Sequence, residues 1–332
     1  MAAYIDYNVI IGVNLGLMAI MLLPISAMLC ASFLLVRRSK DPARVAFTYL
    51  KVMLPLAFLW FAMYTIEGAL ELVYQNSTVY WWTNDSIYKA SLRTSLLGSL
   101  FYRLAGLLSV MTLVELGNGF LFCLTETRTA LQKAMRNAGI ASCIVLFIIA
   151  FASFGIQNEA YSQYLATPWA YEDVGESLFS AGGKLSAAFD IILFAWAVVL
   201  VVFAVLVFKE IKHNNALKNS AVLFLAAIVL NLIARLYGII YASIFNLAGL
   251  DWGHESYTVV MFLDPFMSEW IFTVIVALVF SIAIRKRNGL WTTMQPWMDA
   301  QGPPALATSG AKGMGQRNAA HVGRDEEAGR GW

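Results

Sequence analysis

Several acidic and basic residues of this 332-residue chain lie inside long apolar stretches, where charged side chains are costly and often functional. Five acids and two arginines fall toward the same predicted side of the membrane: Glu67, Glu71, Arg103, Asp190, Arg235, Asp264 and Glu269. Two arginines can neutralise only two carboxylates, and burial favours the protonated form of the others. A carboxylic acid kept protonated in an apolar chamber can act as a general acid at neutral pH. The candidate catalytic acids are Glu67, Glu71, Asp264 and Glu269.

The spacing of these residues along predicted helices indicates which of them share a face. Steps of four, three and four residues place on one face Trp60, Tyr64, Glu67 and Glu71. Asp264 precedes Pro265, which removes a backbone donor and is expected to kink the helix. Without that kink, Glu269 would lie about 140° around an ideal helix from Asp264. The alternative to a chemical site is a set of buried ion pairs that fix helix register, such as Arg103 with Glu67 or Arg235 with Asp264.

Membrane-spanning helices must position these residues. The chain is 59% hydrophobic and 13% charged, whereas soluble domains are typically about 45–50% apolar and about 25% charged. Seven continuous apolar stretches, without the two-residue alternation of barrel strands, predict helices. They cover about 9–36, 45–74, 95–124, 137–156, 185–208, 221–247 and 258–284. We expect an all-α, polytopic, seven-helix membrane bundle over residues 1–287. A net charge of +2 gives no indication of nucleic-acid binding.

The Lys and Arg residues near the span ends predict the orientation of the bundle. Thirteen lie on one side and three on the other, which places the N-terminus outside or in the lumen and the C-terminus in the cytosol. Two glycosylation sequons, at Asn76 and Asn84, fall in the predicted outer segment 75–94. Residues 288–332 are rich in Gly, Ala and charge and predict a disordered cytosolic tail. Its first part, Leu290-Trp291 through Trp297-Met298, is expected to lie on the membrane surface.

Several known chemistries lack their residues here. The last span, 258–284, has no lysine for a retinal Schiff base. The Asp-Arg-Tyr and Asn-Pro-x-x-Tyr motifs of rhodopsin-like receptors are absent. The histidines lie in separate segments and predict no metal site. We therefore expect no cofactor. What remains is proton chemistry or ligand binding in an acid-lined chamber.

The layout of the spans and two acids resembles the small integral-membrane terpene cyclases of fungal meroterpenoid and indole-diterpene pathways. The resemblance is carried by Glu67 in Trp60…Tyr64…Glu67 and by Asp264 in Phe262-Leu263-Asp264-Pro265. It implies that these acids protonate the terminal epoxide of a prenyl chain and that a carbocation cascade then closes rings, without metal or redox cofactor. This chain has an additional tail and a longer outer loop than the smallest members of that family.

A lipophilic substrate would reach such a site from the lipid bilayer, and aromatic faces would stabilise its cations. The predicted substrate-binding residues are Trp60, Tyr64, Arg103, Asp190, Arg235, Tyr237 and Trp270. An enzyme of this kind is expected in the endoplasmic reticulum.

Two other functions fit the same sequence. A divergent fungal-type seven-helix receptor would be expected at the plasma membrane, although the predicted inner joints 125–136 and 209–220 are short for binding a G protein. A proton-coupled transporter could use Glu115 and Asn118, which extend polarity toward the cytosol. The chain lacks the internal repeat that many transporters have.

Overall fold

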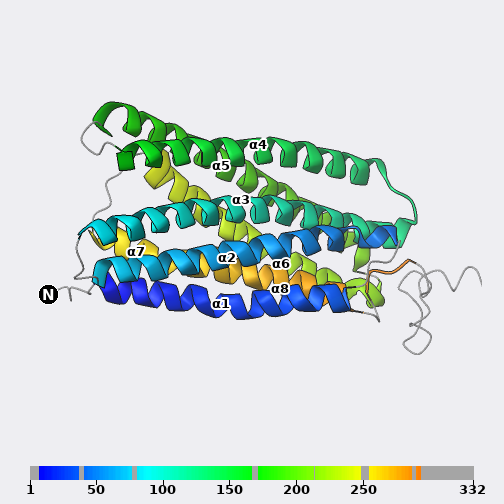
Figure 1. The fold of residues 1–332 in the computed structure, drawn as a ribbon. Coiled ribbons are helices and arrows are strands. Elements are labelled where there is room, and N and C mark those ends of the chain that lie inside the picture. Colours follow the sequence, from blue (N-terminus) through cyan, green and yellow to red (C-terminus); the bar gives the residue numbers. More distant parts are fainter. Residues whose placement is uncertain are drawn as a thin grey trace, which may run out of the picture.

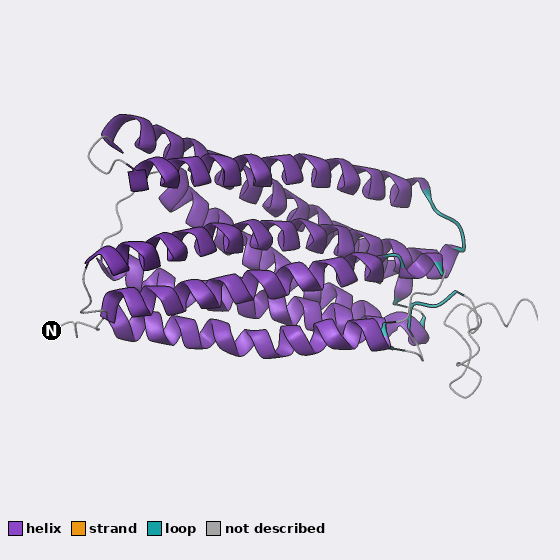
Figure 2. Cartoon of the chain, in the orientation of Figure 1, coloured by secondary structure: helices purple, strands orange, loops and turns teal. Residues whose placement is uncertain are grey.

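The computed structural model describes residues 7–36, 41–76, 81–166, 171–212, 214–247, 254–285 and 289–292, which are helical almost throughout (Figure 2). Eight α-helices carry most of this structure: α1 (Tyr7–Leu35), α2 (Ala46–Asn76), α3 (Trp81–Thr125), α4 (Ala130–Ala166), α5 (Tyr171–Ile211), α6 (Asn215–Tyr241), α7 (His254–Asp264) and α8 (Ile271–Ile284). Three short segments complete it: the 3₁₀-helix η1 (Pro42–Arg44) and the π-helices η3 (Ala242–Leu247) and η4 (Pro265–Trp270). The expectation of an all-helical fold is confirmed for the described residues.

The helices run side by side as one bundle, with α1 along one edge, α4 along the opposite edge and α3 between them (Figure 1). Seven of the resulting helical stretches are long and apolar enough to cross a membrane, and α7, η4 and α8 together form the seventh, Val259–Ile284. The third stretch is the most buried, because α3 packs against α2, α4, α5 and α6. Residues on α3 are therefore well placed to reach the centre of the bundle.

The long helices extend further than the predicted apolar spans. The three predicted spans 95–124, 137–156 and 185–208 lie within α3, α4 and α5, which have 45, 37 and 41 residues. A helix of 45 residues is about 68 Å long, roughly twice the ~30 Å hydrocarbon core. Most of the predicted joints 75–94, 125–136 and 157–184 are thus helical. Hydropathy marks only the part of a helix that lipid requires to be apolar, and polar residues continue the same helix beyond it.

The start of α2 and the end of α8 meet at one end of the bundle. We call the end at which α1 finishes and α2 begins the inner end; it is the end that the sequence predicts to face the cytosol. At this end the guanidinium of Arg44 lies 3.7 Å from the ring centroid of Trp291 and 4.6 Å from that of Phe47. The same guanidinium donates hydrogen bonds to the carbonyl oxygens of Ala283 at 2.7 Å and Leu290 at 3.4 Å. Arg44 thereby joins the start of α2 to the end of α8.

The segment 289–292 completes this contact, which we call the inner latch (Asp41, Arg44 and residues 289–292). The Asp41 carboxylate accepts hydrogen bonds from the backbone N–H and the hydroxyl of Thr292, both at 2.7 Å. Leu290 and Trp291 are buried. Leu290 and Trp291 thus pack against the bundle instead of lying on the membrane surface, and residues 293–332 of the predicted surface segment and tail lie outside the described part of the structure. The cause of this packing is Arg44, whose planar cation offers a stacking partner for the indole.

Candidate functional site

Two neighbouring cavities lie between the helices in the half of the bundle away from the inner end. The central cavity has a volume of about 290 Å³ and is lined by residues of α2, α3, α5, α6, α7, η4 and α8. The side cavity has a volume of about 330 Å³ and is lined by residues of α1, α2, α3, α6 and α7. Tyr64, Tyr241 and Asp264 belong to the walls of both cavities. The two cavities are therefore adjacent, with Asp264 in the wall of each, and each is comparable in volume to a small ligand site.

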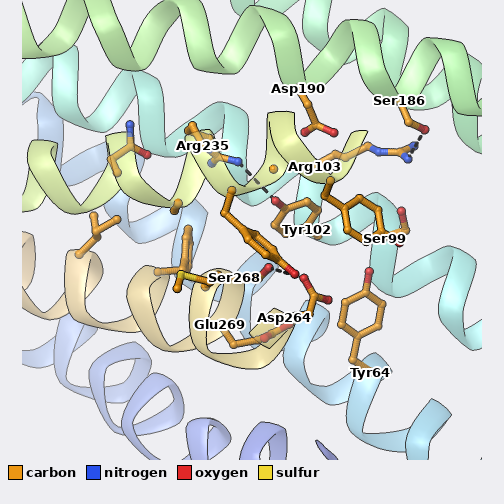
Figure 3. Close-up of a pocket in the computed structure, with 18 residues that line it drawn as sticks. Tyr64, Ser99, Tyr102, Arg103, Ser186, Asp190, Arg235, Asp264, Ser268 and Glu269 are labelled. Carbon is orange, nitrogen blue, oxygen red and sulfur yellow. Dashed lines mark hydrogen bonds between the residues drawn. The ribbon is translucent and has the colours of Figure 1, made fainter. Parts of the chain in front are cut away.

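The cavities bring together most of the residues that the sequence singled out. The central cavity is lined, among others, by Tyr64, Arg103, Asp190, Arg235, Tyr237, Asp264 and Glu269 (Figure 3). The side cavity is lined, among others, by Tyr64, Glu67, Glu71 and Asp264. All four candidate catalytic acids thus lie in the wall of at least one cavity, although they come from two separate spans of the chain.

Asp264 and Glu269 both face the central cavity because the backbone between them is a π-helix, η4. In a π-helix the hydrogen bonds run from residue i to i+5, so residues five apart are about one turn apart. The sequence predicts that a proline kink brings these two acids to one side of the helix. Pro265 is indeed the first residue of η4, but the change in helical register is what places the carboxyl groups on one side. Single turns of π-helix are frequent at functional sites.

Glu269 is fully buried, and neither of its carboxyl oxygens has a hydrogen-bond partner among the described residues. An ionised carboxylate in this position would carry a large desolvation cost without compensation. The environment therefore favours the neutral acid. Asp264 is better supported, because the hydroxyl of Ser268 donates a hydrogen bond to its Oδ1 at 3.0 Å. The two acids differ accordingly: one is held in place by a donor, and the other has hydrogen-bonding capacity to spare.

The two arginines of the central cavity are held by hydroxyl groups. Arg103 donates hydrogen bonds to Ser153 Oγ at 2.9 Å and Ser186 Oγ at 2.7 Å. Arg235 donates from Nη1 to the hydroxyl of Tyr102 at 3.5 Å. Sequence reasoning missed both serines; small polar residues inside apolar spans were the available signal.

Ion pairs between the cavity arginines and the acids Glu67, Asp264 and Glu269 do not explain why these charged residues lie in the cavity walls. Within 4.0 Å and among the residues that the structure describes, neither arginine forms an ion pair with Glu67, Asp264 or Glu269, nor does Asp190 with either arginine. The pairs considered above, Arg103 with Glu67 and Arg235 with Asp264, are thus not formed. The acids remain available to act on a bound molecule.

Two predicted substrate-binding residues lie outside the walls of both cavities. Trp60 is buried behind them, with its ring centroid 4.7 Å from that of Tyr102 and 5.2 Å from that of Phe272. Trp270 turns toward α1, where its indole N–H donates to the carbonyl oxygen of Leu17 at 3.3 Å. Both tryptophans therefore support the walls by packing. Helical periodicity could place them on a face, but it could not distinguish a wall from the layer behind it.

Gly98 on α3 provides the space for Tyr64. A Cβ atom at position 98 would lie 2.5 Å from Cδ1 and Cε1 of the Tyr64 ring, so the ring would have to move. We expect Gly98→Ala to lower the free energy of unfolding by about 1–3 kcal/mol through overpacking, measured by denaturation in detergent micelles. Gly155→Ala on α4 is the matched control, since a Cβ there meets nothing within 4 Å. A Gly98→Ala protein as stable as the control would contradict this packing.

A separate polar cluster lies near the inner end. Arg136 Nε is 3.4 Å from Glu115 Oε1, so this acid has a cationic partner of its own. The cleft around Glu115 and Asn118 has a volume of about 20 Å³, enough for about one water molecule. Glu115 therefore differs from Glu67, Asp264 and Glu269 because it has a cationic partner and borders only a small cleft.

The glycosylation sequons remain predictions. Asn76 is the last residue of α2, and its side-chain amide donates to the carbonyl oxygen of Leu72 at 2.9 Å. Asn84 falls within α3 rather than in the expected loop, and its side chain lies outside the described part of the structure.

Comparison with protein-family models, curated proteins and solved structures found no match for this chain.

Proposed function

We propose that this protein is a membrane-embedded terpene cyclase that protonates the epoxide of a prenyl chain without a cofactor. The observation that carries the proposal is the meeting of Glu67, Asp264 and Glu269 around two adjacent cavities, with no guanidinium within 4.0 Å of them among the described residues. Acid-initiated cyclisation needs a proton donor shielded from water.

The reaction is an isomerisation. Asp264 would donate its proton to the epoxide oxygen, and the C–O bond at the more substituted carbon would break. The π electrons of the neighbouring alkene would then form a C–C bond to that carbon. Loss of a proton from the last cation ends the cascade and restores the acid, so nothing besides substrate is consumed. We assign Asp264 as the donor because it borders both cavities; Glu67, in the wall of the side cavity, is the second donor position.

Aromatic faces in the central cavity suit the cationic intermediates. Its wall includes Tyr64, Tyr102, Tyr237, Tyr241 and Phe272. The attraction between a desolvated cation and the face of such a ring is about 2 kcal/mol or more. We assign to these rings the cation-stabilising role that was predicted in part for Trp60 and Trp270.

Turnover of a prenyl epoxide is the direct test. The full-length protein in microsomal membranes is incubated with a farnesyl ether carrying a terminal epoxide, and products are separated by chromatography and mass spectrometry. We expect a cyclised product of unchanged mass, and none from the double variant Glu67→Gln/Asp264→Asn. Absence of product with folded wild-type protein, or undiminished product with the double variant, would refute the proposal.

A receptor is the second candidate, because a cavity in the predicted outer half could equally hold a signalling ligand. Against it, only residues 126–129 and 212–214 connect α3 to α4 and α5 to α6 at the inner end, which leaves little chain to contact a G protein. Localisation of a tagged protein separates the two: the endoplasmic reticulum is expected for the cyclase, and the plasma membrane for a receptor.

A further inference from the structure

Charge is distributed unevenly around the central cavity. One side carries Arg103 and Arg235 with Asp190 beside them, and the opposite side carries Asp264 and Glu269 (Figure 3). We call the first side the basic wall. Its two guanidinium groups face a single nearby acid, and that acid is not within 4.0 Å of either of them. The basic wall therefore has an excess of positive charge that no described side chain neutralises in contact.

The basic wall also has hydrogen-bond donors without acceptors. Arg235 is 7% exposed, and its Nε atom has no hydrogen-bond partner among the described residues. Asn231, one helical turn earlier on α6, is 2% exposed, and its Nδ2 atom likewise lacks a partner there. Buried donors are rarely left without acceptors in native proteins. Two of them on one helix face, both on residues lining the same cavity, indicate that a bound molecule supplies the acceptor.

The surroundings hold the Arg235 guanidinium at the wall. Gly106 on α3 allows this position, because a Cβ atom there would lie 3.1 Å from Arg235 Nη2. The neighbouring Arg103 is already engaged by Ser153 and Ser186, so it contributes charge but fewer free donors. Arg235 and Asn231 are thus the groups with capacity to bind.

We propose that Arg235 and Asn231 form a subsite for an oxyanionic headgroup, a carboxylate or an enolate, at the end of the substrate away from the epoxide. The inference rests on the proposed function and specifies its substrate class: a prenyl chain attached to an acidic headgroup. Two donors on neighbouring side chains match the two oxygens of a planar, singly charged group. A doubly charged phosphate fits less well, because Asp190 offsets one of the two guanidinium charges that line this cavity.

Equilibrium binding tests the subsite without requiring turnover. The full-length protein in nanodiscs of neutral lipid is titrated with farnesoic acid, farnesol and farnesylamine at neutral pH. We expect the acid to bind at least about tenfold more tightly than the alcohol, the scale of a charge-assisted hydrogen bond, and the amine to bind most weakly. Arg235→Gln should abolish the preference for the acid. Arg93→Gln is the matched control, since Arg93 is exposed on α3 and lines a different cleft.

A second variant keeps the test decisive if Arg235→Gln fails to fold. Asn231→Leu preserves the guanidinium and should reduce the preference for farnesoic acid about threefold or more. Oleate, a straight-chain carboxylate, separates a substrate headgroup from a fatty acid of the bilayer: tighter binding of farnesoic acid supports the proposal, and equal or tighter binding of oleate overturns it. Equal affinity of the wild-type protein for acid and alcohol also overturns it.

The outcomes of this test are independent of those for catalysis. Asp264→Asn should retain the preference for farnesoic acid although it is expected to lose turnover. A preference for the acid in a protein that cyclises nothing would refute the proposed function and leave the subsite standing. Cyclisation by a protein that shows no such preference would refute the subsite and support the proposed function.

Discussion

Asp264→Asn is expected to slow cyclisation of a prenyl epoxide by about 10²- to 10⁴-fold, the usual contribution of a general acid. The amide keeps the size of the side chain and can still accept the hydrogen bond from Ser268, which is 3.0 Å from Asp264 Oδ1. It cannot donate a proton to an epoxide at a useful rate. The loss should therefore appear in kcat, with KM changed much less. Initial rates over a range of substrate concentrations measure both constants.

The controls for this prediction separate chemistry from folding. Glu210→Gln on α5 removes an exposed carboxyl group near the inner end and should leave kcat unchanged. Asp264→Glu keeps an acid on the same segment and should recover part of the lost rate. If Asp264→Asn turned over as fast as Glu210→Gln, Asp264 would not be the proton donor, and Glu67 would be the next acid to test.

Trp291→Ala is expected to lower the free energy of unfolding by about 3–5 kcal/mol, the usual cost of truncating a buried aromatic side chain. The substitution exposes the Arg44 guanidinium, which lies 3.7 Å from the indole centroid. It also removes the N–H that donates to the carbonyl oxygen of Arg285 at 3.1 Å. Unfolding by sodium dodecyl sulfate in mixed micelles, followed by circular dichroism, gives the difference between the two proteins.

Trp291→Phe isolates the contribution of the ring. Phenylalanine retains an aromatic face for Arg44 but lacks the N–H donor, so we expect a loss of only about 1 kcal/mol. Equal stability of the Trp291→Ala and wild-type proteins would mean that the inner latch contributes nothing to folding. A specific effect on the latch should also leave prenyl-ligand affinity unchanged, because Trp291 is distant in the fold from the cavity walls.

The location of the candidate acids could be predicted because depth along a helix is a local property. Glu67 lies nine residues before the end of α2, and Arg103 lies 22 residues before the end of α3. Once the direction of each span is known, such positions give the depth along the bundle at which each side chain lies. Hydropathy and the asymmetry of Lys and Arg supplied that direction, so convergence of the acids at one level followed without coordinates.

Which residues form a wall could not be predicted in the same way. Trp60 and Tyr64 share a helix face, yet Tyr64 lines both cavities and Trp60 packs behind them. The difference depends on how close α3 and α8 approach α2, and on Gly98 leaving room for the Tyr64 ring. A single helix carries no information about the distance to its neighbours.

By itself the amino-acid sequence determined that seven apolar stretches are helical, that these stretches can cross a membrane and that acids outnumber arginines among the charged residues of the predicted outer half. These properties follow from side-chain hydropathy and from the cost of exposing backbone groups to lipid, both of which act locally. Only the tertiary structure decided that η4 turns Asp264 and Glu269 to one side, that serines rather than acids hold Arg103, and that Trp291 packs on Arg44. Those arrangements depend on helical register and on contacts between residues far apart in the chain, which no local pattern encodes.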